Sequence, residues 1–249
     1  MNQLKYRLAQ LVSSTQRTKP AYQIHRRVLM YHSISQHKQS DKNIYSLSQQ
    51  DFAQHVELLH ELHKTETSKV VKLDSSDRCG ITITFDDGYQ DTLTIAAQTL
   101  VEKNLPFTVF VSSANITSGD SKFLNQQELI ELSKVSGATI GSHGHAHTHL
   151  AEMTPQDVES DLKHSKDWLE QIVQKPVTTL SYPHGSYNDD VVRIASEIGF
   201  EYAATSKWGV FEVGTKKLEI PRIDIWSQDS RAVLQQKLFG KWEWIARLV

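Results

Sequence analysis

The stretch that decides the fold reads ITITFDDGY, residues 81–89. Its alternating Ile and Thr residues are β-branched and predict a strand, which breaks at Asp86-Asp87-Gly88. Neighbouring side chains of a regular strand point to opposite faces, but Gly88 lets the backbone turn, so that both carboxylates can reach one cavity. Since α/β barrels place their chemistry at the carboxyl ends of strands, we expect Asp86 and Asp87 in an active site. The alternative is an Asp-Asp-Gly turn with two solvated carboxylates.

Strands and helices alternate on both sides of this stretch, with short connections. This alternation is typical of βαβ units with a parallel sheet, so the expected fold class is α/β. A single-domain barrel and an open doubly wound sheet both fit the pattern. The expected strands lie at 28–35, 70–73, 81–85, 106–113, 138–142 and 178–182, and the expected helices at 48–64, up to 100, 126–135, 154–173, 189–200 and 230–249.

The bulk composition excludes several classes of protein. The chain has 249 residues, which one α/β barrel can accommodate. Its net charge of −2 provides no basic field for a phosphate backbone, so we expect no nucleic-acid partner. The single cysteine, Cys79, permits neither an internal disulfide nor a thiolate metal site, and we expect it to be buried as a small apolar residue.

We expect residues 1–25 to form a helical extension. The α/β domain itself is placed at residues 26–249. Leu4, Leu8 and Leu11 recur at helical spacing within the extension. The N-terminal residues contain no long apolar run, and no stretch has the roughly 18 apolar residues of a membrane span. We therefore expect a cytoplasmic protein with neither a secretory signal nor a transmembrane segment.

The C-terminal helix expected at 230–249 is amphipathic, with basic residues and tryptophans beside its apolar face. Such helices can lie in a membrane interface, which would give peripheral contact with the inner membrane face. We favour the other interpretation, that the helix packs on the barrel, because amphipathic helices mostly cover cores. The apolar positions are Leu234, Leu238, Ile245 and Val249, flanked by Trp242 and Trp244.

Four histidines alternate in SHGHAHTHL, residues 142–150. His143 and His147 stand four residues apart, as do His145 and His149, so one helical turn would let either pair share a metal ion. The spacing does not choose between the pairs. One aspartate with two histidines suits Zn²⁺ or a redox iron, and a spare carboxylate beside them favours hydrolysis. We expect ordinary surface or helix-face positions for the remaining histidines, His25, His37, His55, His60, His63 and His164.

Three motifs together resemble the polysaccharide deacetylase family (NodB homology, carbohydrate esterase family 4) over roughly residues 28–226: TFDDGY at 84–89, GSHGHAHTHL at 141–150 and SYPHGSYN at 181–188. VLMYHSIS, residues 28–35, resembles the branch of poly-N-acetylglucosamine deacetylases that carries Tyr-His ahead of TFDDG. The resemblance implies a distorted (β/α) barrel and hydrolytic, metal-dependent removal of N-acetyl groups from a sugar, with Zn²⁺ as the expected metal.

The resemblance also assigns roles to the residues of the first two motifs. Asp86 matches the family's general base, and Asp87 matches a metal ligand. His143 and His147 match the two ligand histidines, which selects that pair.

The third motif and the early Tyr-His complete the implied site. The backbone N–H of His184, which follows Tyr182 and Pro183, matches the donor that stabilises the oxyanion. His32 matches the general acid of the branch, because no histidine follows His184 where the rest of the family has its acid. An ordinary histidine of the barrel core or rim is the alternative for His32.

The chain departs from the family pattern at three positions. Gly144 replaces Ser or Thr, Ser181 replaces an arginine that tethers the base, and His184 replaces an aromatic residue. Arg222 is the candidate for the missing cation, with a surface ion pair as the alternative. Asp224 is a candidate for orienting a catalytic group, with a solvated strand-end carboxylate as the alternative.

A cytoplasmic deacetylase of this kind would act on a carbohydrate precursor, lipid-linked or nucleotide-linked, rather than on finished wall polymer. Three other functions compete with this hypothesis. The first is a catalytically inactive glycan-binding module on the same fold, the second is a redox non-haem iron protein, and the third is a hydrolase of another amide.

Overall fold

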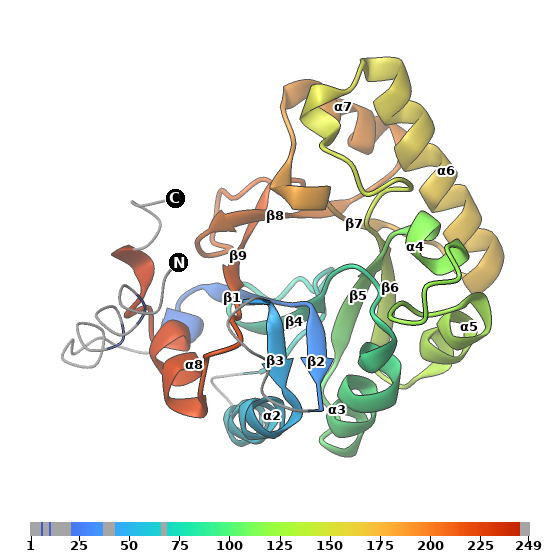
Figure 1. Cartoon of the computed structure of the whole chain (residues 1–249). Coiled ribbons are helices and arrows are strands. Elements are labelled where there is room, and N and C mark those ends of the chain that lie inside the picture. The colour runs from blue at the N-terminus through green and yellow to red at the C-terminus, as the bar shows by residue number, and fades with distance from the viewer. Residues whose placement is uncertain (1–5, 7–9, 11–20, 37–42, 66–68, 245–249) are drawn as a thin grey trace.

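The computed structural model describes Tyr6, Gln10 and residues 21–36, 43–65 and 69–244. Seven parallel strands close into a barrel in the order β1, β4, β5, β6, β7, β8, β9, and β9 pairs with β1 (Figure 1). Because the sheet closes on itself, the structure confirms the expected (β/α) barrel and excludes the open doubly wound sheet. The strands are β1 Arg26–Tyr31, β4 Gly80–Phe85, β5 Phe107–Val111, β6 Ala138–Ser142, β7 Thr179–Ser181, β8 Tyr202–Trp208 and β9 Ile220–Asp224.

Helices surround the barrel (Figure 1), and several begin at the residues that the sequence indicates as N-caps. Ser48 accepts the N–H of Asp51 at the start of α2, and Thr154 accepts that of Asp157 ahead of α6. The helices are α2 Gln49–His63, η2 Thr92–Ala97, α3 Gln98–Glu102, α4 Ser113–Thr117, α5 Gln126–Lys134, α6 Pro155–Val173, α7 Asp189–Ile198 and α8 Arg231–Leu238, with short turns η1 Ala21–Gln23, η3 Leu150–Glu152 and η4 Pro183–Gly185.

Two local expectations about strands need correction. The stretch 28–35 is not one strand, because His32 interrupts it: β1 ends at Tyr31, and β2 (Ser33–Ser35) pairs with β3 (Ser46–Ser48) in a separate two-stranded sheet. The stretch 70–73 forms only an isolated bridge, between Val70 and Ile81.

Alternate residues of the strands face the barrel interior and the outer helices. On β5, Phe110 belongs to an inner cluster, whereas its neighbours Val109 and Val111 pack into the larger core shared with the helices. Gly141 on β6 makes room for the Phe110 ring, since a Cβ there would lie 2.6 Å from the ring carbon Cδ1. Side chains therefore fill the barrel, and polar groups collect above them at the carboxyl ends. The inner cluster comprises Val28, Leu73, Phe110, Tyr202, Ala204 and Ile220.

The described part of the C-terminal segment, up to Trp244, packs on the protein, in agreement with the favoured interpretation. α8 ends at Leu238, earlier than expected, and Leu234, Leu238 and Trp242 are buried. Tyr6 packs against Trp226 and Trp242. Within the described part of the chain, no helix has the length and apolarity needed to cross a membrane. The expected positions Leu4, Leu8, Leu11, His37, Ile245 and Val249 lie outside the described residues, and the domain boundary at residue 26 stays a prediction.

Two side chains lie elsewhere than the sequence predicts. Cys79 is exposed, because it belongs to the loop that ends just before β4 begins at Gly80. His55 of α2 is fully buried, and its Nε2–H donates to the Asp229 carbonyl while its Nδ1 accepts from the Tyr31 hydroxyl. Burial lowers the pKa of His55 to about 4, so the ring is neutral.

Candidate active site

A pocket of about 400 Å³ opens at the carboxyl ends of the barrel strands. Its walls include His32, Asp86, Asp87, His143 and His147, which come from three separate stretches of sequence. Parallel strands of a barrel bring such distant residues together because all their carboxyl ends open on the same face.

The turn after β4 aims two adjacent carboxylates into this pocket. The strand ends at Phe85, and Asp87 and Gly88 both adopt positive φ angles, of 72° and 73°. This left-handed pair reverses the ordinary alternation of side chains, as the Asp-Asp-Gly sequence predicts. A left-handed aspartate is strained, which is a common feature of functional sites.

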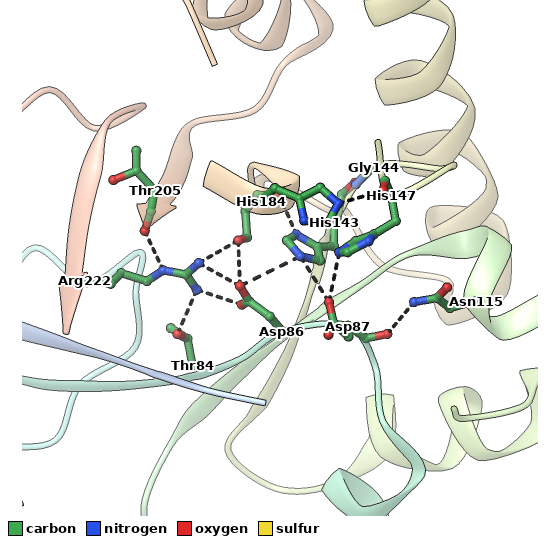
Figure 2. Close-up of polar contacts among 12 residues, drawn as sticks. Thr84, Asp86, Asp87, Asn115, His143, Gly144, His147, His184, Thr205 and Arg222 are labelled. Carbon is green, nitrogen blue, oxygen red and sulfur yellow. Dashed lines mark hydrogen bonds and ion pairs between the residues drawn. The ribbon is translucent and has the colours of Figure 1, made fainter. Parts of the chain in front are cut away.

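Asp87, His143 and His147 form a cluster whose ligand atoms all lie within 4.8 Å of one another. Asp87 Oδ1 lies 3.0 Å from His147 Nε2 and 3.4 Å from His143 Nε2 (Figure 2). His143 Nδ1–H donates to the Ser181 carbonyl over 2.7 Å, which leaves its Nε2 facing Asp87. Burial would raise the pKa of Asp87, but the hydrogen bonds from the two histidines hold it well below its usual range. Two nitrogens and one carboxylate oxygen fit a divalent metal with open positions.

The histidine loop brings its rings together without a helical turn. His147 has a φ of 52°, and residues 143–149 contain no helix, so the helical reasoning behind the spacing was wrong. The loop is held instead by Asp161 of α6, whose carboxylate accepts the backbone N–H groups of His145 and Ala146, both at 2.8 Å. Sequence reasoning missed Asp161. The signal was an acidic residue on the mostly apolar buried face of α6, among Val158, Leu162 and Leu169.

The other histidine pair lies outside the cluster. His145 Nδ1 is hydrogen-bonded to the Ser113 hydroxyl at 2.8 Å, and its ring packs on His164. His149 stacks on His184. Gly144 explains one departure from the family pattern, because its φ is +67° and a Cβ there would lie 2.8 Å from Asp161 Oδ1. A serine at this position would displace the carboxylate that holds the loop.

Asp86 lies between Arg222, which clamps its carboxylate, and His143, whose Nε2 is 3.9 Å from Asp86 Oδ2 (Figure 2). Arg222 Nη1 and Nη2 each lie 2.7 Å from a different carboxylate oxygen, and the Ser181 hydroxyl donates to Oδ2. Arg222 is fully buried, so it is not a surface cation, and it also donates to Thr84 and Thr205. Burial would raise the pKa of Asp86, but the charges of Arg222 and His143 keep it below its ordinary value.

His32 follows the end of β1 and lines the same pocket. Burial lowers the pKa of its imidazole, while the charges of Asp86 and Asp87 act in the opposite direction. Its ring packs against Tyr45, with ring centroids 4.6 Å apart. Tyr45 and Tyr89 also line the pocket, and sequence reasoning missed both, although Tyr89 directly follows Asp-Asp-Gly. Burial and a hydrogen bond to Asp87 raise the pKa of Tyr89 to about 12.

The remaining predicted residues lie at or beneath the rim. His184 has a φ of 57°, an exposed ring and an Nε2–H that donates to the His147 carbonyl. Tyr182 and Pro183 are buried below the rim, and the Tyr182 hydroxyl donates to the Leu218 carbonyl. Burial raises the pKa of Asp224 to about 6, and its Oδ1 has no hydrogen-bond partner among the described residues. The structure does not bring Tyr182, Pro183 or Asp224 into the pocket wall.

Residues 74–203 match the family model described as polysaccharide deacetylase, which spans the turn after β4, the histidine loop and the SYPHG motif. The chain belongs to this family. YxkH of Bacillus subtilis, which carries the name of a polysaccharide deacetylase, is 30% identical over 73% of this chain and 64% of its own length. The polysaccharide deacetylase chain described here thus matches less than two thirds of that relative.

Two further matches agree with the family. The poly-β-1,6-N-acetyl-D-glucosamine N-deacetylase of Staphylococcus epidermidis is 23% identical over 72% of this chain and 68% of its own length. The structure of Streptococcus pyogenes deacetylase PplD in complex with acetate superposes with a TM-score of 0.74 and 22% identity, covering 86% of this chain and 98% of that one. This structural similarity confirms the fold.

Proposed function

We propose that this polysaccharide deacetylase is a metal-dependent hydrolase that removes acetyl groups from the nitrogen of an N-acetylated sugar. The observation that carries the proposal is the division of the pocket between two carboxylates. Asp87 faces His143 and His147, whereas Asp86 is held by Arg222. One carboxylate is thus available to bind a cation and the other to handle a proton.

Asp87, His143 and His147 would hold the metal, and the mixed nitrogen and oxygen donors favour Zn²⁺. When bound there, a divalent cation polarises a carbonyl oxygen and makes water more acidic. The Ser181 carbonyl accepts the Nδ1–H of His143, so in the neutral ring Nε2, which faces Asp87, would carry the lone pair that binds the metal.

Asp86 takes the proton of the attacking water in this proposal. A general base must be ionised before the reaction, and the two hydrogen bonds from Arg222 favour the ionised carboxylate. Arg222 therefore does what the arginine of the third motif does elsewhere in the family, from β9 instead of β7. The backbone N–H of His184 donates to the developing oxyanion, and His32 protonates the leaving nitrogen.

The family and the relative of Staphylococcus epidermidis support a proposal for the substrate class. We infer that the pocket accepts N-acetylglucosamine units, in a glycan or in a lipid-linked or nucleotide-linked precursor. The 400 Å³ pocket is suited to one or two sugar rings, since small-ligand pockets begin at about 300 Å³.

The test is acetate release from N-acetylglucosamine oligomers by metal-free and Zn²⁺-loaded protein. We expect acetate only from the loaded protein, and none from His147→Ala after the same Zn²⁺ treatment. Oligomer binding without acetate from any such substrate would favour an inactive glycan-binding module. Release of formate or another acid from a different amide would favour the related hydrolase, and oxygen-dependent turnover would favour the iron protein.

The acid role of His32 has a separate test. His32→Ala should slow acetate release by about 10²–10⁴-fold while metal content stays unchanged. The alkaline limb of the rate profile should also disappear, because it reports loss of the protonated imidazole. An unchanged bell-shaped profile in His32→Ala would overturn the assignment.

A further inference from the structure

Two imidazoles of the pocket are held in different ways. The His143 ring is fixed by a hydrogen bond of 2.7 Å from its Nδ1–H to the Ser181 carbonyl. The Nδ1 of His32 is buried, yet it has no hydrogen-bond partner among the described residues. A group that transfers a proton must be oriented within a narrow range, so something other than a hydrogen bond at Nδ1 must hold the His32 ring.

Tyr45 is the residue that packs on this ring. The two ring centroids lie 4.6 Å apart and the ring planes are inclined by 36°. Both side chains line the active-site pocket, and Tyr45 is partly buried there. Ring packing at this distance is attractive and restricts rotation of the smaller ring.

The backbone around Tyr45 is anchored on both sides. The N–H of Tyr45 donates to the side-chain oxygen of Asn43 over 3.2 Å, and the carbonyl of Ile44 accepts the N–H of Ser227 over 2.6 Å. On its C-terminal side, β3 begins at Ser46. These contacts keep the Tyr45 ring in place over His32 instead of leaving it on a free loop.

The turn that carries Ser227 is itself fixed from the core. Between β9 and α8, the Trp226 N–H donates to Asp229 Oδ2, and the buried Lys237 of α8 donates to the same oxygen and to the Asp224 carbonyl. The core therefore fixes the turn, the turn fixes the backbone at Ile44 next to Tyr45, and Tyr45 packs on His32.

We propose that Tyr45 is a positioning residue, whose ring holds the imidazole of His32 in the orientation needed to protonate the leaving nitrogen. The proposal rests on the proposed function, in which His32 is the general acid. It assigns the role to the aromatic ring, because it is the ring that contacts His32. It also predicts that Tyr45 acts on turnover more than on substrate binding.

The test compares Tyr45→Ala with Tyr45→Phe, which keeps the ring and removes the hydroxyl. A displacement of about 1 Å at a reacting group can cost about 10²-fold, so we expect Tyr45→Ala to lower kcat by roughly 10–100-fold with KM nearly unchanged. Tyr45→Phe should retain most of the wild-type kcat. A loss confined to KM in Tyr45→Ala would overturn the proposal and indicate a stacking surface for the sugar.

A double-mutant cycle with His32→Ala isolates the coupling. We expect Tyr45→Ala to cause no further loss of kcat once His32 is absent, because there is no ring left to position. The same fold-loss in both backgrounds would contradict the proposal. Metal content measured in all variants excludes damage to the metal site.

The imidazole signals in the NMR spectrum of Zn²⁺-loaded protein test the positioning role of Tyr45 separately from the general-acid role of His32. His32 should give one sharp ring signal in wild-type and Tyr45→Phe protein, and a shifted or broadened one in Tyr45→Ala. A His32 signal that is identical in all three proteins would overturn the positioning role. If instead His32→Ala left kcat unchanged, the general-acid assignment would fail, and the NMR result would still report whether Tyr45 holds the ring.

Discussion

Asp86 and Asp87 are chemically identical neighbours with different surroundings. Asp86 continues the direction of β4 into the barrel mouth and meets a buried arginine, whereas Asp87 adopts a left-handed backbone and meets two histidines. The pKa of both carboxyls is held below its ordinary value although burial acts in the opposite direction. The comparison teaches that a short left-handed turn at Asp87 and Gly88 is enough to place two identical side chains in different surroundings.

The largest effects should come from removing the ligand side of this comparison. We expect Asp87→Ala, His143→Ala and His147→Ala each to lose Zn²⁺ and activity. The loss of metal affinity should exceed the roughly 10–100-fold that is typical when a residue hydrogen-bonded to a metal ligand is removed. Metal content after dialysis and acetate release measure both. His145→Ala and His149→Ala are the matched controls, because their rings point to Ser113 and His184 instead. A control that lost metal as completely as His147→Ala would contradict the assigned ligand set.

Removing Arg222, the cation beside Asp86, tests the role of the general base. Arg222→Met should lower activity at neutral pH by about 10²-fold or more, because an unpaired buried carboxyl binds its proton more tightly and fails as a base. Without Arg222 the pKa of Asp86 rises, so the acidic limb of the rate profile should move to higher pH.

The same variant should destabilise the fold by about 3–5 kcal/mol, the usual cost of breaking a buried ion pair. Arg231→Met, which breaks a half-exposed pair with Glu61, should cost at most about 1 kcal/mol. Urea unfolding of both variants gives the comparison, and equal losses would show that burial of the Arg222 pair does not matter.

Much of the site could be predicted from the sequence because its signals are local. Asp-Asp-Gly after a β-branched strand places two carboxylates, and an alternating histidine run limits the ligands to two pairs. Arg222 remained ambiguous, since nothing in IPRIDIW says that its side chain faces inward to a carboxylate of another strand. Asp161 and Tyr45 were missed for a similar reason, because their roles arise from contacts between separate elements of the fold.

A third aspartate, Asp91, extends the comparison, because it is largely buried and forms no ion pair with a described residue. Burial raises its pKa to about 6, while the hydroxyl of Ser33 donates to its Oδ2 over 2.7 Å. The folded protein therefore keeps this proton up to higher pH than the unfolded chain, whose carboxyl titrates near 4. Stability from this group is present below pH 4 and is lost as pH rises through about 6.

Asp91→Asn removes that penalty and still accepts the Ser33 hydrogen bond. Relative to the wild type, its Tm should rise on going from pH 4 to pH 8 by roughly 5 °C. Asp167→Asn, which alters an exposed pair with Lys163, is the control and should show no such trend. A difference in Tm that is independent of pH would contradict the raised pKa.

The division of labour between the two carboxylates is tested most directly by Asp86→Asn, with Zn²⁺ content and acetate release measured on the same sample. We predict wild-type Zn²⁺ content and a loss of turnover of about 10²–10⁴-fold, because the amide cannot take a proton from water. Near wild-type acetate release, or loss of Zn²⁺ as complete as in Asp87→Ala, would contradict the assignment of Asp86 as base and Asp87 as ligand.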